Sequence, residues 1–278
     1  YVYDNDFDAK LKNGTVISRN VTIHGNGFMI NASNLAKIFN LTANGVTFKD
    51  IIFANANNTN FRGGAICGNC TVINCTFINN RAYYGGAIYG NCTVINSSFA
   101  NNYASYHGGA IYGNCTVTKS NFTNNSISTY GEGGAIYGYA DVSDSLFINN
   151  SANEYSYGGA IYKGTARNCT FINNSAYYEG GAIYEGSAAN STFINNTARS
   201  SGGAIYNGNA TNCRFINNSA GSYGEGGAIY KGSAVNSTFI NNTGKSGGAI
   251  YGDGTQTAVN CNFVNNSAST GGATYNVN

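Results

Sequence analysis

The sequence predicts an all-β protein, a right-handed parallel β-helix (β-solenoid) of about twelve coils of 21–25 residues. The first observation is a repeated Gly-Gly-Ala motif followed by Ile or Thr, whose leading glycines are residues 63, 85, 108, 133, 158, 180, 202, 226, 247 and 271. The second is a Phe-x-Asn-Asn motif, whose phenylalanines are residues 77, 99, 122, 147, 171, 193, 215, 239 and 263. A fixed period of this size is typical of solenoids, in which each unit buries its apolar face against its neighbours. The third is that no window shows the 3.6-residue periodicity of a helix.

Two regions of the chain differ in their pattern. Residues 63–278 carry about ten regular repeats, and residues 1–62 do not. Short β-type runs at residues 21–23, 28–30 and 46–48 are separated by glycines. Because solenoids need atypical end units to cover the core, we expect residues 1–62 to form irregular coils and a cap on the same solenoid.

Within a repeat, three positions are expected to face the interior. In the first repeat they are Phe77, Cys75 two residues before it, and Val72 five residues before it. The Gly-Gly-Ala-Ile-Tyr segment is expected to form one short strand. Since Ile78 follows Phe77, strict alternation of inward and outward residues should fail near there, and we expect a bend.

The Asn-Asn pair that ends the motif is the expected turn. One asparagine of each pair should stack on its equivalents in the neighbouring coils. Its amide can donate to one coil and accept from the other, as in cross-β stacks, so that its polar atoms are satisfied inside the protein.

Composition excludes several classes of protein. Charged residues make up 9% of the chain and the net charge is +2, with no basic stripe, so we expect no nucleic-acid partner. No apolar run approaches 18 residues, so we expect no transmembrane segment in this chain, which we interpret as a mature or excised piece of a longer protein.

No cofactor and no metal are expected. Asp4, Asp6 and Asp8 have the alternation of a calcium loop, but Ala9 replaces the required glycine and Thr15 replaces the bidentate acid. A solvated terminus is the favoured interpretation.

The eight cysteines have two possible roles. At the position two residues before Phe, cysteine alternates with serine, which indicates a small buried side chain. Cys70, Cys92 and Cys115 form a separate column in consecutive coils, close enough for a disulfide since stacked strands lie ~4.8 Å apart. Free buried thiols and a disulfide within this column both remain open.

The length of the repeat varies on one side only. From Phe to the next Gly-Gly the spacing runs from 8 to 11 residues, so insertions collect in loops along one edge. Loops are where binding residues concentrate, and tyrosine suits recognition surfaces. The candidate binding residues in these loops are Tyr83, Tyr84, Tyr106, His107, Tyr130, Glu132, Tyr155, Tyr157, Tyr178, Glu179, Tyr223 and Glu225.

Three of these candidates leave a catalytic alternative open. Glu132, Glu179 and Glu225 each precede a Gly-Gly pair and lie two coils apart, a spacing that approaches the carboxylate separation of inverting glycosidases. Tyr157 and Ser201 occupy the intervening positions, and no basic side chain is placed to complete a site. We therefore favour no catalytic residues.

The paired motifs Gly-Gly-Ala-Ile and Phe-x-x-Asn resemble the repeats of chlamydial polymorphic membrane proteins, whose passenger regions are β-helical adhesins. The line Asn-Cys-Thr-Phe-Ile-Asn-Asn at residues 74–80 and 168–174, with the segment at residues 21–27, is similar to adhesin-like surface proteins of methanogenic archaea. This resemblance implies display on the outside of a cell. It carries a function only by analogy, because the motif is a core motif.

We therefore expect a non-catalytic, extracellular cell-surface adhesin, with surface glycans or proteins of other cells as partners. One alternative is a self-assembling structural protein or filament subunit joined end to end. A second alternative is a polysaccharide lyase or glycosidase.

Overall fold

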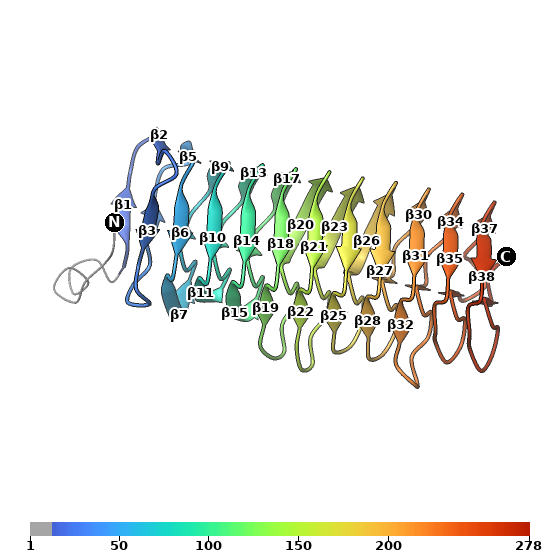
Figure 1. Ribbon diagram of the computed structural model, residues 1–278. Helices are drawn as coiled ribbons and strands as arrows, with labels where there is room; N and C mark the ends of the chain where they lie inside the picture. Colours follow the sequence, from blue (N-terminus) through green and yellow to red (C-terminus); the bar gives the residue numbers. More distant parts are fainter. Residues whose placement is uncertain (1–12) are drawn as a thin grey trace.

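The computed structural model describes residues 13–278, which form one long rod built by winding the chain around a single axis (Figure 1). The described residues are all β with no helix, and strands of successive coils pair in parallel. The parallel β-helix is therefore confirmed. One of its sheets takes a strand from each coil and has 11 strands, so there are eleven coils where about twelve were expected. The calcium-type motif at Asp4, Asp6 and Asp8 lies outside the described residues.

Three parallel sheets run along the rod. Sheet A, with 11 strands, consists of β3 (Met29–Asn31), β6 (Ile52–Ala54), β10 (Thr76–Ile78), β14 (Ser98–Ala100), β18 (Asn121–Thr123), β21 (Leu146–Ile148), β24 (Thr170–Ile172), β27 (Thr192–Ile194), β31 (Arg214–Ile216), β35 (Thr238–Ile240) and β38 (Asn262–Val264). Sheet C, with 8 strands, consists of β7 (Asn57–Arg62), β11 (Arg81–Tyr84), β15 (Tyr103–His107), β19 (Ser126–Ile127), β22 (Ser151–Ala152), β25 (Ser175–Ala176), β28 (Thr197–Ala198) and β32 (Ser219–Ala220).

Sheet B, with 20 strands, takes two segments from most coils, and in three coils the two segments merge into one strand. It consists of β1 (Thr15–Ile17), β2 (Val21–His24), β4 (Phe39–Leu41), β5 (Val46–Lys49), β8 (Ile66–Cys67), β9 (Cys70–Ile73), β12 (Ile88–Tyr89), β13 (Cys92–Ile95), β16 (Ile111–Tyr112), β17 (Cys115–Thr118), β20 (Ile136–Ser143), β23 (Ile161–Arg167), β26 (Ile183–Ala189), β29 (Ile205–Tyr206), β30 (Ala210–Thr211), β33 (Ile229–Tyr230), β34 (Ala234–Val235), β36 (Ile250–Tyr251), β37 (Ala258–Val259) and β39 (Thr274–Tyr275). Strand β4 pairs with β8, so the irregular first coils and the regular repeats share this sheet. The division at residue 62 is one of sequence pattern within a single body.

The core is a column of phenylalanine rings. From Phe53 to Phe263 each ring stacks on the next with centroids 4.7–5.1 Å apart and planes within 13°. This distance matches the ~4.8 Å separation of paired strands, so identical residues in register must stack. The apolar position five residues earlier is also buried, as expected, from Val72 to Ala234.

The alternation of inward and outward residues ends just after Phe, as expected, although the residue that follows Phe faces outward. In β24, Phe171 is buried while Thr170 and Ile172 on either side are half-exposed. Inward and outward residues alternate as far as Ile172 and the alternation then fails, because the next residue, Asn173, is also exposed; the expected bend lies there. The chain turns one residue later, at Asn173, which has a left-handed φ of 53°. Asparagine tolerates this conformation better than most residues.

The Gly-Gly pair forms a corner rather than part of a strand. Gly180 has a φ of 67°, and a Cβ on Gly181 would lie 2.0 Å from the carbonyl oxygen of Gly203 in the next coil. The first glycine is required by its conformation and the second by the close approach of backbone. The strand begins only at Ile183.

The second asparagine of each pair forms the expected buried ladder. In the coil of β24, the side-chain amide of Asn174 donates to Asn196 Oδ1 and to the carbonyl oxygen of Phe147, each at 3.0 Å. Its own Oδ1 accepts from the backbone and side-chain N–H groups of Asn150, each at 3.0 Å. Both donors and both acceptor positions of the amide are thus used without water.

A parallel column holds cysteine or serine. Ser120 Oγ accepts from the backbone N–H of Ser97 at 3.1 Å and donates to the carbonyl oxygen of Thr118 at 2.9 Å. Cys213 is buried at the same position and its thiol contacts the carbonyl oxygen of Thr211 at 3.3 Å. The expected small inward side chain is confirmed.

Replacing Asn174 with Ala should lower the free energy of unfolding by about 3–5 kcal/mol, because the variant leaves two N–H groups of Asn150 without an acceptor. Denaturant unfolding of the wild type and the variant measures the difference. The matched control is Asn173→Gly, which keeps the left-handed corner and should change stability by less than about 0.5 kcal/mol. Equal effects of the two substitutions would show that the ladder does not hold the coils together.

Candidate functional site

The candidate binding residues lie on one edge of the rod, where sheet C leads to the Gly-Gly corners. Tyr83 and Tyr84 end β11, and Tyr106 and His107 end β15. The later candidates lie in loops after the two-residue strands of sheet C. They are Tyr130, Glu132, Tyr155, Tyr157, Tyr178, Glu179, Tyr223 and Glu225. The structure separates these twelve residues into two sets that the sequence does not distinguish.

The first set, here called the corner column, contains the residue immediately before each Gly-Gly pair. All its candidate members are half-buried: Tyr84, His107, Glu132, Tyr157, Glu179 and Glu225. They lie beside a column of stacked tyrosines from Tyr89 to Tyr275, whose ring centroids are 4.7–5.2 Å apart. This second column is called the tyrosine column.

Each corner residue interacts with the tyrosine of the following coil. The ring of Tyr84 lies 5.3 Å from that of Tyr112, and the ring of Tyr157 lies 5.1 Å from that of Tyr184. The same relation joins polar members, since the Glu132 carboxylate hydrogen-bonds with Tyr162.

Burial between the two columns changes their titration. It raises the pKa of Glu132 and Glu179 above the usual carboxyl value. Burial also raises the pKa of Tyr162 and Tyr206 to about 12. The next cause is a nearby carboxylate, which is Glu132 for Tyr162 and Glu179 for Tyr206. The phenols therefore stay protonated near neutral pH. The corner column and the tyrosine column together form a packed seam along the rod.

His107 lies inside this seam. Its ring stacks against Tyr84 at 5.6 Å and Tyr137 at 4.6 Å, and its Nδ1 accepts the backbone N–H of Glu132 at 3.1 Å. An Nδ1 that accepts this bond carries no proton, so the imidazole is neutral with its proton on Nε2. Burial lowers the pKa of His107 from 6.5 to about 4, so the Glu132 carboxylate 3.4 Å away does not form a true ion pair near neutral pH.

The second set consists of the remaining candidate tyrosines, which lie at the ends of β11 and β15 or in the later loops. Tyr83, Tyr130, Tyr155 and Tyr223 are exposed, whereas Tyr106 and Tyr178 are half-buried. Tyr83 stacks on Tyr106 at 5.8 Å, and Tyr130 stacks on Tyr155 at 4.9 Å with planes within 7°. Tyr155 also contacts Tyr178 at 5.8 Å. We call these residues, with the neighbouring Tyr177, the tyrosine ridge: Tyr83, Tyr106, Tyr130, Tyr155, Tyr177 and Tyr178. Tyr223 stands further along, 85% exposed, with the Lys245 ammonium 5.2 Å from its ring.

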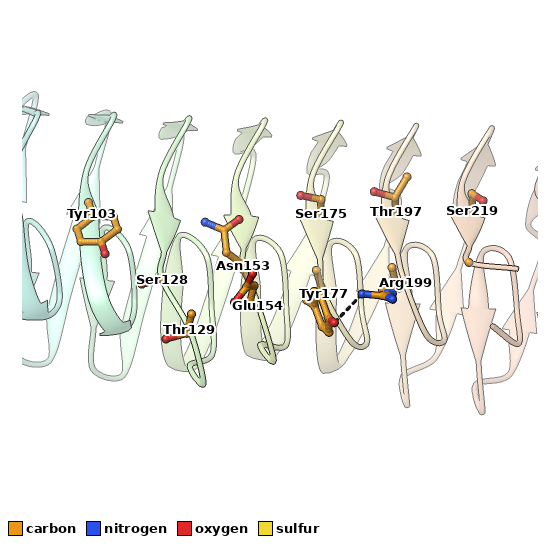
Figure 2. Close-up of a pocket in the computed structure, with 14 residues that line it drawn as sticks. Tyr103, Ser128, Thr129, Asn153, Glu154, Ser175, Tyr177, Thr197, Arg199 and Ser219 are labelled. Carbon is orange, nitrogen blue, oxygen red and sulfur yellow. Dashed lines mark hydrogen bonds between the residues drawn. The ribbon is translucent and has the colours of Figure 1, made fainter. Parts of the chain in front are cut away.

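Beside the ridge runs a groove of about 740 Å³ along sheet C. Figure 2 shows Ser175, Thr197 and Ser219 in a row, one from each coil, in agreement with the register of β25, β28 and β32. Below this row in the same view, Arg199 lies 4.7 Å from the Tyr177 ring and donates a hydrogen bond to its hydroxyl at 2.5 Å. The groove thus offers hydroxyls at a fixed spacing together with an aromatic and a cationic side chain.

Sequence reasoning missed the groove. Its residues outside the candidate set include Tyr103, Ser128, Thr129, Asn153, Glu154, Ser175, Tyr177, Thr197, Arg199 and Ser219. The available signal was the Ser or Thr that follows the Asn-Asn pair in seven successive repeats, from Ser126 to Ser267. An outward polar residue recurring once per coil predicts a row of hydroxyls along the rod.

The cysteine column lies on a different part of the surface from the ridge. Cys70, Cys92 and Cys115 are buried, in register on β9, β13 and β17, and free in this structure. Burial raises the pKa of the Cys70 thiol to about 12, and contact with Cys115 raises that of Cys92. A disulfide within the column stays a prediction.

Two further facts concern residues 13–278. In this part of the chain no cluster of three or more His, Cys, Asp or Glu side chains is arranged to hold a metal ion. The same residues contain no helix with the length and apolarity that a membrane crossing requires.

Comparison with known proteins identifies the kind of repeat. The Chlamydia polymorphic membrane protein repeat matches residues 74–91, 96–114, 144–163, 168–184, 190–208, 212–231 and 236–253. The chain therefore contains polymorphic membrane protein repeats, in agreement with the resemblance in its motifs. No curated protein sequence matches the chain.

One solved structure, described as the complex structure of alginate lyase AlyF-OU02 with G6, aligns with 94% of this chain and 59% of that chain. The identity is 15% and the TM-score is 0.38. The chain thus spans less than two thirds of that protein. A likeness at this level does not bear on the activity of the chain.

The titration of His107 predicts a pH dependence. Because the pKa of His107 is lower in the folded than in the unfolded state, the neutral imidazole contributes fully to stability above about pH 6.5. This contribution should be lost as the pH drops toward about 4. At ~1.4 kcal/mol for each pH unit of difference, the loss is at most about 3 kcal/mol. The raised pKa of Glu132 opposes it at the acid end, since the folded state then favours the protonated carboxyl.

Thermal unfolding between pH 7 and pH 4 should therefore show a steeper loss for the wild type than for His107→Gln. The control is His24→Gln, because it removes an imidazole from an exposed strand position. Parallel curves for the wild type and His107→Gln would contradict the assignment.

Proposed function

We propose that the chain is a non-catalytic, extracellular adhesin-type β-helix of the kind found in surface proteins, as its resemblance to adhesin-like proteins of methanogenic archaea suggests. It attaches to glycans or proteins on other cells through the tyrosine ridge and the groove of sheet C. The polymorphic membrane protein repeats support display at a cell surface.

The observation that carries the proposal is the exposure of stacked tyrosines beside a groove lined by hydroxyls. Tyr130 is 62% exposed although it is aromatic, and its ring is held by Tyr155 at 4.9 Å. Tyrosine and arginine dominate the energetics of recognition surfaces, because they offer large contact area with few freely rotating bonds. Holding the rings in a stack before binding lowers the entropy lost on association.

The contacts of the glutamates favour a binding role over a catalytic one. The carboxylate of Glu132 is engaged by Tyr162, and that of Glu225 hydrogen-bonds with Tyr251. Glu179 lies between these two in the corner column, with Tyr157 and Ser201 as its neighbours. The carboxylates of Glu132 and Glu225 are therefore engaged by tyrosines of the seam, and burial raises the pKa of the Glu179 carboxyl between them.

The triple variant Tyr130→Ser, Tyr155→Ser, Tyr177→Ser should weaken binding to whole cells or to arrayed glycans by at least about tenfold. The matched control is Tyr139→Ser, because Tyr139 is 67% exposed but lies in sheet B, away from the ridge. Circular dichroism establishes that each variant is folded. Equal binding by the triple variant and the wild type would rule out the ridge as the binding surface.

Incubation with neutral and acidic polysaccharides should release no new reducing ends and no unsaturated products. Glu132→Gln serves as the comparison, because it removes one seam carboxylate while keeping its shape. Cleavage by the wild type that is lost in Glu132→Gln would replace the adhesive proposal with a catalytic one.

A further inference from the structure

We propose that a second binding site, for a ring compound bearing a carboxylate such as an acidic sugar, lies at the N-terminal end of the tyrosine column. The cavity there has a volume of about 540 Å³. It is lined by Asn13, Lys37, Asn40, Asn58, Asn60, Phe61, Arg62, Cys67, Tyr83 and Tyr84. The cavity shares Tyr83 with the ridge, but the proposal does not depend on binding by the rest of the ridge or by the groove.

The cavity exists because the tyrosine column stops. Tyr89 pairs in register with Cys67, and Cys67 pairs with Asn40. Each later coil fills this position with a tyrosine ring, whereas these two coils carry small side chains. The space that two rings would occupy is left open between β4, β8 and β7.

A cation with a largely buried side chain lines this space. Lys37 lines the cavity and is 9% exposed, and its stem is covered by Gly14, where a Cβ would lie 3.2 Å from Lys37 Cδ. Among residues 13–278 its ammonium has no hydrogen-bond or ion-pair partner. Because the opposite charge of an anion attracts an ammonium more strongly beside a protein wall than in open water, such a group is expected to meet an anion when the site is filled.

A second cation lies on the same wall. The Arg62 guanidinium is 5.0 Å from the Tyr89 ring, which follows the rule that a corner residue contacts the tyrosine of the next coil. Within the described part of the chain it forms no ion pair, so its N–H donors are free for a carboxylate. Among residues 13–278, no Asp or Glu side chain lines the cavity.

The remaining wall is aromatic and amide. Phe61 is 64% exposed at the rim, although it is a large apolar residue. Tyr83 lies on β11, the strand of the next coil that pairs with the strand of Phe61. A sugar ring packs its C–H face on such rings, and the Asn40 and Asn60 amides can bond its hydroxyls. Two cations, two aromatic rings and several amides together fit a carboxylated sugar better than a neutral one.

The test is a ligand-observed NMR titration of the full chain with glucuronate and N-acetylneuraminate, with glucose as the neutral probe. Glucuronate or N-acetylneuraminate should bind at least about tenfold more tightly than glucose, and added salt should weaken the binding. Lys37→Met should reduce carboxylate binding at least about tenfold, and Arg62→Gln should also reduce it. Lys119→Met, at an exposed corner between sheets B and A, is the control and should bind as the wild type does.

Thermal unfolding without ligand provides a second readout. Lys37→Met should be as stable as the wild type or more stable, because it removes an unpaired charge and keeps the apolar stem.

Equal binding of glucose and glucuronate, or unchanged carboxylate binding in both Lys37→Met and Arg62→Gln, would overturn the proposal. A loss of stability in Lys37→Met with no difference in carboxylate binding would show that the charge is already neutralised within the chain, and would overturn it as well. The triple tyrosine variant of the ridge leaves Lys37, Arg62 and Phe61 intact, so failure of the two proposals can be told apart.

Discussion

The hydrogen bond from one asparagine side chain to the next is the interaction that keeps the coils of this rod in register. Asn174 shows how complete the arrangement is, because its amide accepts from both N–H groups of Asn150 and donates to Asn196 and to the Phe147 carbonyl. A shift of one residue in this coil would bury the left-handed Asn173 or the outward Ser175 where Asn174 now lies. The ladder therefore fixes which residues face inward, and the phenylalanine stack and the tyrosine column follow from that register.

Corner chemistry explains why the loops vary on one edge only. The corners on either side of sheet A use left-handed asparagines such as Asn168 and Asn173, and the Gly-Gly corner brings the backbone within van der Waals contact of the next coil. An insertion at any of these corners would break the stack. Between sheet C and Gly180 the chain is not bound by this constraint, so insertions and aromatic side chains collect there.

Much of the fold could be predicted from the sequence, because a repeat reports each position many times. Inward Phe, Cys or Ser and Val or Ala positions could be identified from their spacing, and so could an asparagine ladder. The outward Ile172 could not, because an apolar residue next to a buried Phe suggests burial until neighbouring coils are seen to shield it. Nor could the sequence show that His107 and Glu132 are packed in a seam while Tyr130 and Tyr155 are exposed. That difference depends on contact with the tyrosine of the following coil, which sequence distance does not reveal.

The regular stack limits where this protein can bind anything. In the tyrosine column each ring from Tyr112 to Tyr251 lies between two others about 5 Å away, as Tyr184 does between Tyr162 and Tyr206. Both faces of these rings are occupied and only their edges are free. A ligand that needs an aromatic face must therefore find a place where the repeat is broken. The loops break it by displacing tyrosines outward, and the first coils break it by replacing the ring with Cys67 and Asn40. In this chain the perfect repeat stabilises the body, and the departures from it supply the chemistry.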